Sequence, residues 1–303
     1  MATGFHNPVL LVPLLDAIGQ PNRAVDATLG DGGHAAALRE AGAEVLGIDR
    51  DPDAIAVARR RLGDSRMTYL EASFGSDAAL SAVAAFRPDV VLLDLGVSSR
   101  QLDQTERGFS FRPGAELDMR MEGMGPTAAD LLNSTEQATL AEWLSDWADE
   151  PRARRLAAEI VRRRNGKPFE TSDDLVNAIR AVLGPRAGPA DFARIFQGVR
   201  IAVNDELAQL ERALPAFRDA LTPDGRLAVI SYHSGEDRTV KQAFQAWSRR
   251  CICPPRQPVC TCRGRALGRA EPRKPIVPEP AEIADNPRAR SAKLRIFRVA
   301  DEG

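Results

Sequence analysis

Residues 26–34, Asp-Ala-Thr-Leu-Gly-Asp-Gly-Gly-His, combine the residue types that can hold a nucleoside-containing ligand. An apolar run leads into this stretch and a helical pattern follows it at 35–41, which predicts a strand, a glycine turn and a helix. Glycine lets the backbone approach a ligand closely, and the N-terminus of the helix presents free N–H groups. The spacing of Gly30, Gly32 and Gly33 is not the G-x-G-x-x-G pattern of dinucleotide-binding proteins.

Asp49 strengthens this interpretation. It closes the next expected strand, about 20 residues beyond the glycines, where nucleotide-binding folds place a carboxylate that accepts hydrogen bonds from a ribose diol. The glycines alone would be typical of a tight turn that binds nothing. The added carboxylate favours a nucleoside-containing cofactor.

Alternating strands and helices must position these residues. Residues 88–95 are almost all apolar, as expected of a central parallel strand buried on both faces. We therefore predict an α/β fold with a doubly wound, Rossmann-like parallel sheet. The other early elements are strands near 24–25, 45–48 and 67–70 and helices near 8–18, 52–62 and 78–86.

The alternation stops after residue 95. Residues 96–125 are rich in Gly, Ser and Arg without a clear period, and loops of this length are often functional. We predict that a helical, substrate-recognising domain at 127–191 divides the α/β domain into 1–126 and 192–303. Its helices are expected to start near Ser134 or Thr135, at Pro151, and near Thr171 or Ser172.

The α/β pattern then resumes. A long helical pattern covers 192–221, with Pro215 as the place for a break. A buried strand is expected at 225–232 and a helix at 236–247. A final strand at 291–300 is expected at the edge of the sheet.

Ligands of open parallel sheets bind beyond the C-terminal ends of the strands. Several side chains that can do chemistry follow the expected strands, so we expect them to converge there. They are His34, Asp49, Phe74, Asp94, Ser98, Ser99, Gln101, Ser231, His233, Ser234 and Glu236. A lone histidine is usually structural, but His34 and His233 both occupy such ends. The sequence has no nucleophile elbow, which argues against hydrolase chemistry for the serines.

Composition sets broad limits. The chain has 303 residues, a formal net charge of -1 and a pI of about 6.4, so overall charge indicates no class of partner. The start of the chain has no signal-peptide pattern, and no apolar run is long enough to cross a bilayer. We expect a cytoplasmic protein without a membrane partner.

Eight motifs in order resemble one known family. They are Asp26–His34 (as above), Gly47-Ile-Asp-Arg-Asp-Pro52, Asp94-Leu-Gly-Val-Ser-Ser99, Arg107-Gly-Phe-Ser-Phe111, Leu117-Asp-Met-Arg120, Arg200-Ile-Ala-Val-Asn-Asp-Glu206, Ser231-Tyr-His-Ser-Gly-Glu-Asp-Arg238 and Asn286-Pro-Arg-Ala-Arg-Ser291. The chain is similar to the ribosomal RNA small subunit methyltransferase H family over residues 7–299. Eight motifs are far more specific than one glycine turn.

The resemblance implies an S-adenosylmethionine-dependent methyltransferase domain with an inserted helical domain. It implies methyl transfer to the exocyclic N4 of cytosine 1402 in 16S rRNA, with the 30S ribosomal subunit as partner. The cofactor contacts that it implies are Gly32, Gly33, His34, Asp49, Phe74, Asp94 and Gln101.

The residue that receives N4 is open at this stage. The N4 lone pair is delocalised into the ring, so the enzyme must align N4 with the methyl group and accept a hydrogen bond from the amino group. Many amino-group methyltransferases use an Asp/Asn/Ser-Pro-Pro-aromatic motif here, but this chain has Asp-Leu-Gly-Val-Ser-Ser at 94–99. The catalytic candidates are Asp94, Ser98 and His233.

Three basic clusters are candidates for phosphate contacts, although each can also be an ordinary solvated surface. Reversing the charges of Arg162, Arg163 and Arg164 is expected to weaken RNA binding. Phe109 and Phe111 can stack on an unpaired base or anchor their loop to a core. The clusters are residues 152–167, 249–274 (including Arg256) and 288–298.

Cys251, Cys253, Cys260 and Cys262 form two C-x-C pairs, whereas structural zinc sites commonly use C-x2-C. We therefore expect no metal. Two functional alternatives remain open. One is a nicotinamide-dependent oxidoreductase, which Asp49 suits and the glycine spacing does not. The other is a non-catalytic RNA-binding assembly factor.

Overall fold

The computed structural model describes residues 8–104, 107–254, 257 and 259–301. Residues 1–7, where the signal-peptide expectation and the start of the resemblance fall, and Arg256 lie outside this part, as do the side chains of Ser99 and Asp103. The chain forms two compact units. One combines Met1–Gly96 with Leu207–Gly303, and the other is Val97–Glu206.

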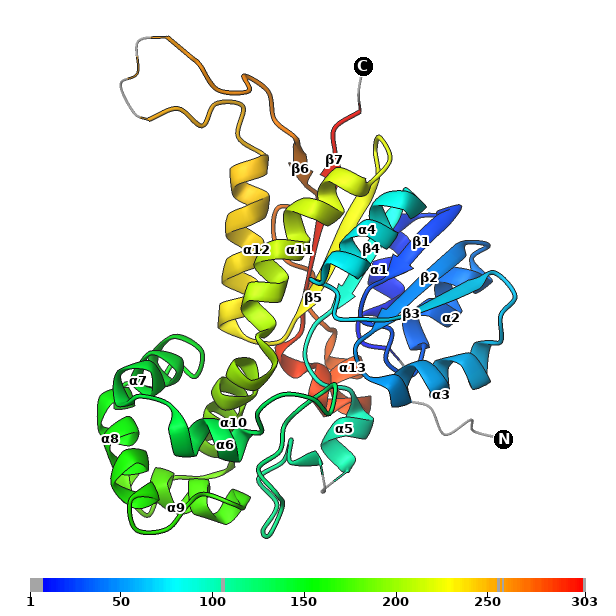
Figure 1. Cartoon of the computed structure of the whole chain (residues 1–303). Helices are drawn as coiled ribbons and strands as arrows, with labels where there is room; N and C mark the ends of the chain where they lie inside the picture. Colours follow the sequence, from blue (N-terminus) through cyan, green and yellow to red (C-terminus); the bar gives the residue numbers. More distant parts are fainter. Residues whose placement is uncertain (1–7, 105–106, 255–256, 258, 302–303) are drawn as a thin grey trace. The chain divides into compact units, whose positions relative to one another are not determined.

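The first unit contains a seven-stranded sheet of order β3-β2-β1-β4-β5-β7-β6 (Figure 1). The first five strands are parallel, whereas β7 is antiparallel to both β5 and β6. The doubly wound Rossmann-like fold expected from the sequence is thereby confirmed. The strands are β1 (Arg23–Asp26), β2 (Glu44–Asp49), β3 (Met67–Glu71), β4 (Val90–Asp94), β5 (Arg226–Ser231), β6 (Gly268–Ala270) and β7 (Lys293–Val299).

Helices cover both faces of this sheet. One apolar cluster joins α1, α2 and α3 to the sheet, and another joins α4, α11 and α12 to it. The Asp51 side chain accepts a hydrogen bond from the Asp53 N–H at the start of α3. The helices are α1 (Leu11–Ile18), α2 (Gly33–Glu40), α3 (Pro52–Leu62), α4 (Asp77–Phe86), α11 (Glu206–Ala220) and α12 (Ser234–Trp247).

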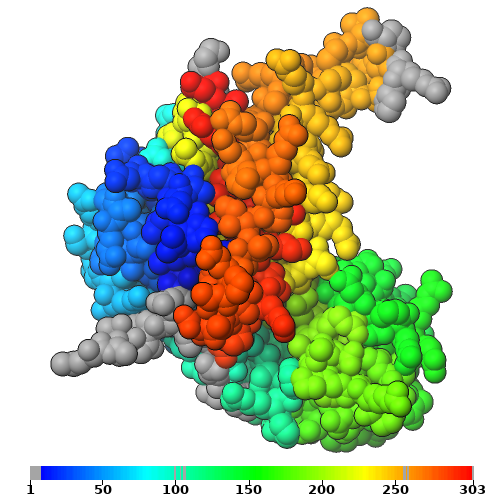
Figure 2. Space-filling view, turned by 180° about the vertical axis from the view of Figure 1, so that it is seen from behind, coloured from blue at the N-terminus to red at the C-terminus, as the bar shows by residue number. Residues whose placement is uncertain are grey.

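The expectation that the last strand lies at the edge of the sheet is wrong. β6, from the Pro/Arg-rich stretch, pairs with β7 and takes the edge position. β7 is internal and buries Leu294 in one apolar cluster and Phe297 in the other. Figure 2 shows the preceding segment in orange and red on the surface, between the blue N-terminal elements and the yellow α12. It contains α13 (Pro280–Asp285) and a short 3-10 helix (Pro287–Ser291).

The second unit is helical and wider than the insertion expected at 127–191. Its core includes Phe109 and Leu117 from the long loop and Phe192 and Val199 from α10, so packing joins these flanking segments to it. The short α6 was not predicted from the sequence. The next helix, α7, begins after Glu136 rather than at Ser134 or Thr135. The helices are α5 (Ser99–Asp103), α6 (Ala128–Ser134), α7 (Gln137–Asp146), α8 (Ala153–Arg164), α9 (Ser172–Leu183) and α10 (Pro189–Asn204).

The helical pattern at 192–221 breaks at Asp205, not at Pro215. Asp205 has a left-handed backbone, with φ 51, whereas Pro215 lies inside α11. Aspartate adopts this conformation more readily than most residues do. Within the described residues, no helix combines the length and apolarity needed to cross a membrane.

Candidate active site

The glycine turn after β1 offers an open backbone face. Gly30 has φ +52, and a Cβ built there would meet only the Thr28 carbonyl oxygen, at 4.0 Å. Its N–H donates to Asp49 Oδ2 over 2.8 Å, which connects the turn to the end of β2. The turn therefore has space for a ligand while its backbone stays fixed.

Gly32 and Gly33 are closely packed against neighbouring side chains. A Cβ on Gly32 would lie 2.8 Å from Leu62 Cδ1, and one on Gly33 would lie 2.8 Å from Pro8 Cγ. Gly32 occupies the N-cap position of α2 and has no side chain that could cap the N–H groups at this helix end. Cofactor binding by these glycines stays a prediction.

Asp49 has its two oxygens fixed by the backbone. Oδ2 accepts the N–H of Gly30 and Oδ1 accepts the N–H of Asp51, both over 2.8 Å. A carboxylate oxygen has two lone pairs, so each oxygen can still accept a ribose hydroxyl. Burial raises the pKa of Asp49 to about 6, and the two backbone N–H groups oppose this shift.

Asp94 ends β4 in a polar network. Its backbone N–H donates to Thr28 Oγ1 over 2.6 Å, and its Oδ1 accepts the hydroxyl of Tyr232 over 2.8 Å. Its Oδ2 lies 3.6 Å from Nδ1 of His34. Burial raises the pKa of Asp94 to about 7, while the Tyr232 hydrogen bond favours the charged form. The site thus holds a carboxylate whose charge changes near neutral pH.

His34 is held by its other ring nitrogen. Nε2 lies 3.0 Å from the carbonyl oxygen of Val9, which can only accept, so the proton resides on Nε2. Burial lowers the pKa of His34, which favours the neutral ring. Asp26 is also buried, and burial raises its pKa to about 6.

These groups suit a cationic nucleoside cofactor. Asp26, Asp49 and Asp94 are acidic groups at the ends of neighbouring strands, and burial raises the pKa of each. A positive charge nearby would stabilise their ionised forms. S-adenosylmethionine carries a sulfonium and an ammonium, so the set of acceptors fits it. Phe74, half-buried after β3, can offer an aromatic face to adenine.

His233 caps α12. Its Nδ1 accepts the N–H groups of Gly235 and Glu236, over 3.2 and 3.4 Å. Its Nε2 contacts Glu236 Oε1 at 3.1 Å, and Glu236 Oε2 accepts the Tyr232 N–H over 2.8 Å. This capping gives His233 a structural role next to Tyr232, and a catalytic role for His233 stays a prediction. Sequence reasoning missed Tyr232, which directly follows β5, and Thr28, which lies two residues after β1.

Ser98 and Gln101 belong to the second unit and cap α5. The Gln101 N–H donates to Ser98 Oγ over 3.2 Å, and the Ser98 N–H donates to Gln101 Oε1 over 3.0 Å. This reciprocal capping box explains both residue types at this spacing. A catalytic role for Ser98 and a cofactor contact by Gln101 therefore stay predictions.

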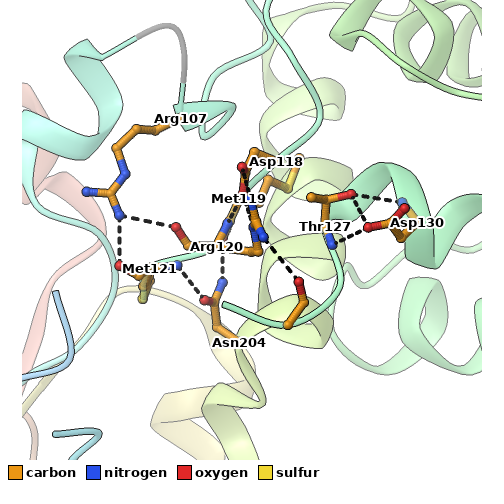
Figure 3. Close-up of polar contacts among 9 residues, drawn as sticks. Arg107, Asp118, Met119, Arg120, Met121, Thr127, Asp130 and Asn204 are labelled. Carbon is orange, nitrogen blue, oxygen red and sulfur yellow. Dashed lines mark hydrogen bonds and ion pairs between the residues drawn. The ribbon is translucent and has the colours of Figure 1, made fainter. Parts of the chain in front are cut away.

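Three of the family-like motifs converge within the second unit (Figure 3). Asn204 accepts the N–H of Met121 over 3.0 Å and donates to the carbonyl of Met119 over 2.8 Å. The guanidinium of Arg107 donates to the carbonyls of Arg120 and Met121. Their shared task is to fix the irregular loop at 107–121.

The aromatic residues of this loop are anchored in the core. Phe109 is 7% exposed, and Phe111 packs edge to face against Phe192 and Phe196, at 5.8 and 6.1 Å between ring centroids. Of the two roles left open from the sequence, the structure favours the anchor.

Much of the basic surface is already paired. Arg162 and Arg163 contact Glu159, and Arg164 donates to the carbonyls of Leu132 and Thr135. In the C-terminal cluster, Arg295 and Lys293 pair with Asp237, and Arg298 pairs with Asp224. On α8, Arg154 and Arg155 lie earlier in the helix than the arginines that contact Glu159, and both are exposed.

An antiparallel β7 between β5 and β6 departs from the all-parallel order of dinucleotide-binding sheets. The chain belongs to the MraW methylase family, whose profile matches residues 3–300. It is therefore a Rossmann-like methyltransferase whose methyl donor is S-adenosylmethionine. Both the nicotinamide alternative and the non-catalytic alternative are therefore wrong.

Relatives with established names agree along almost the whole chain. The "Ribosomal RNA small subunit methyltransferase H" of Gemmatimonas aurantiaca is 57% identical over 302 residues, which cover 98% of this chain and 96% of the relative. The protein of that name from Rubrobacter xylanophilus is 46% identical, covering 99% and 98%. An rRNA methylase structure from Streptococcus thermophilus covers 95% of this chain and 92% of its own, with a TM-score of 0.41 and 12% identity.

Proposed function

We propose that this methyltransferase acts on 16S rRNA of the 30S ribosomal subunit in the cytoplasm and methylates N4 of cytosine 1402. The observation that carries the proposal is the near-full-length identity to relatives named as rRNA small subunit methyltransferases. The eight ordered motifs are consistent with it, since they cover both units.

Asp94 is the group that we assign to the reacting amine. The cofactor supplies a methyl group activated by its sulfonium. The ionised carboxylate of Asp94 accepts a hydrogen bond from the N4 amino group, which localises the nitrogen lone pair for attack. Tyr232 holds Oδ1 of this carboxylate, and Thr28 holds the Asp94 backbone.

The helical unit, Val97–Glu206, is proposed to recognise rRNA. Its helix α8 presents the exposed Arg154 and Arg155, which suit phosphate oxygens. Its long loop is held by buried hydrogen bonds to Asn204. A fixed loop of this kind can present a defined surface to RNA.

Nucleoside mass spectrometry tests this proposal. The substrate is 30S subunits from cells that lack the modification, incubated with the protein and S-adenosylmethionine, and the control is subunits that already carry it. We expect N4-methylcytidine at one site in the unmodified subunits and no incorporation in the control. Methylation at another nucleotide would refute the target, and no transfer despite cofactor binding would refute the substrate.

A further inference from the structure

All four cysteines of the chain lie in the segment between α12 and β6. This segment extends past the C-terminal end of α12 (Figures 1 and 2). Cys251 and Cys253 lie on the limb that leaves α12, and Cys260 and Cys262 lie on the limb that returns to β6. The two C-x-C pairs therefore face each other across the segment.

The four sulfur atoms are arranged at the spacing of a metal tetrahedron. Cys251 and Cys253 Sγ each lie 3.8 Å from Cys260 Sγ, Cys262 Sγ lies 3.8 Å from Cys251 Sγ, and Cys260 and Cys262 Sγ are 3.5 Å apart. All four lie within 4.8 Å of one another. Zinc–sulfur bonds of about 2.3 Å in tetrahedral geometry require sulfur–sulfur edges of about 3.8 Å.

Other causes do not explain this convergence. The contacts are too long for disulfides, whose sulfur–sulfur bond is about 2.05 Å. Cys251 and Cys260 are exposed, and none of the four belongs to an apolar cluster of the described residues, so burial does not gather them. Thiols are weak hydrogen-bond donors, and closing the loop costs entropy. A shared cation would compensate that cost.

We propose that the four cysteines bind one Zn²⁺ ion as thiolates. Four protein ligands leave no open position, so the site is structural and not catalytic. The backbone N–H of Ile252 donates to Cys262 Sγ over 3.3 Å, the type of outer contact that orients a metal ligand. The C-x-C spacing led us to expect no metal. We revise that expectation because each limb of the segment supplies one pair of cysteines, and the two pairs together form the tetrahedron.

The ion would fix a segment whose base is already attached to the fold. The guanidinium of Arg263 donates to the carbonyls of Ala246, Trp247 and Arg249, at the C-terminal end of α12. The described residues between 250 and 262 belong to no apolar cluster. The zinc would thus take the place of a core for the tip of the segment.

Metal analysis of the full-length protein tests the site. The protein is purified under reducing conditions from zinc-supplemented cultures, and its zinc content is measured by mass spectrometry after gel filtration. We expect about one zinc per chain, and less than about a tenth of that in the variant Cys253→Ser/Cys262→Ser. The matched control is Val259→Ser, which changes an exposed residue of the same segment and retains the zinc.

Cobalt replacement gives a second measurement on the unaltered chain, so the test does not depend on the folding of a variant. We expect sulfur-to-cobalt charge transfer and the intense visible bands of tetrahedral cobalt. Wild-type protein without zinc, and without these bands after cobalt addition, would overturn the site. Equal zinc in the wild type and the double cysteine variant would overturn its ligands. Neither readout depends on methyl transfer, so the proposed function is tested separately.

Discussion

At the scale of single residues, Asp94 is placed to act as a hydrogen-bond acceptor whose charge depends on pH. Burial raises its pKa to about 7, and the Tyr232 hydroxyl acts against that shift by stabilising the carboxylate. Both oxygens of Asp94 can act purely as hydrogen-bond acceptors for the amino group only when the carboxyl is ionised. Methyl transfer should therefore decline as the pH falls through the pKa of Asp94.

Asp94→Asn is expected to lower kcat by about 100-fold or more, because an anionic acceptor at the reacting nitrogen is lost. The acidic limb of the pH–rate profile should disappear with it. Single-turnover methylation of 30S subunits across a pH series measures both effects. Asp16→Asn, an exposed site on α1, serves as the control. Full turnover by Asp94→Asn with unchanged cofactor affinity would contradict the role.

Tyr232→Phe separates positioning from catalysis. Removing the hydroxyl removes a hydrogen bond that favours the charged carboxylate, so the pKa of Asp94 rises. The acidic limb should move to higher pH by about half a unit to one unit, while the rate at high pH changes little. An unmoved limb in the same single-turnover series would show that Tyr232 does not tune Asp94.

At the scale of elements, α8 shows why a run of arginines is not uniformly available to RNA. Arg162 and Arg163 share Glu159, which lies three and four residues earlier on the helix. Arg164 donates to the carbonyls at the end of α6, so its reversal would also disturb the packing of the unit. The N-terminal half of α8 is the cleaner target.

Arg154→Glu/Arg155→Glu is expected to weaken binding to 30S subunits and to lower the slope of log K against log salt by about 1 per lost phosphate contact. Filter binding over a salt series gives the slope. Arg60→Glu on α3 is a control for charge reversal at an exposed site in the other unit. If the double variant kept the wild-type slope, α8 would not contact the phosphates.

At the scale of the whole molecule, two groups of carboxyls make the stability of the fold depend on pH, each in a different pH range. Asp26, Asp49 and Asp94 have pKa values raised from the ordinary 3.8, so the folded chain binds more protons than the unfolded chain between about pH 4 and pH 7. Their contribution to stability is therefore greatest in acid and is lost as the pH rises. Asp237 and Glu159 have lowered pKa values, so their contribution is lost on acidification below about pH 4.

Binding of S-adenosylmethionine should counteract the loss of stability that Asp26, Asp49 and Asp94 cause as the pH rises. The stabilisation by S-adenosylmethionine, measured as a rise in Tm, is expected to grow between about pH 5 and pH 7, because its positive charges favour the ionised carboxyls. S-adenosylhomocysteine lacks the sulfonium and should show a smaller increase. Thermal unfolding with each ligand, at one fixed ligand concentration for both pH values, measures the difference. Equal shifts at both pH values would contradict the electrostatic role of the three aspartates.

The sequence by itself determined the elements that are set by local pattern. Apolar runs fixed the parallel strands, and Asp51 and Thr171 fixed the starts of α3 and α9 through local hydrogen bonds. The acidic residues at the ends of β2 and β4 could be named for the same reason, since strand ends meet at one edge of a parallel sheet.

Only the tertiary structure decided features that depend on partners distant in sequence. The internal position of β7 follows from pairing with β5 and β6, and the width of the helical unit follows from packing of Phe109 and Phe192 in one core. The Tyr232–Asp94 contact joins residues 138 positions apart. The cysteines came together across a loop that spacing alone argued against. Local patterns cannot encode such contacts, because their energy arises only when distant segments meet.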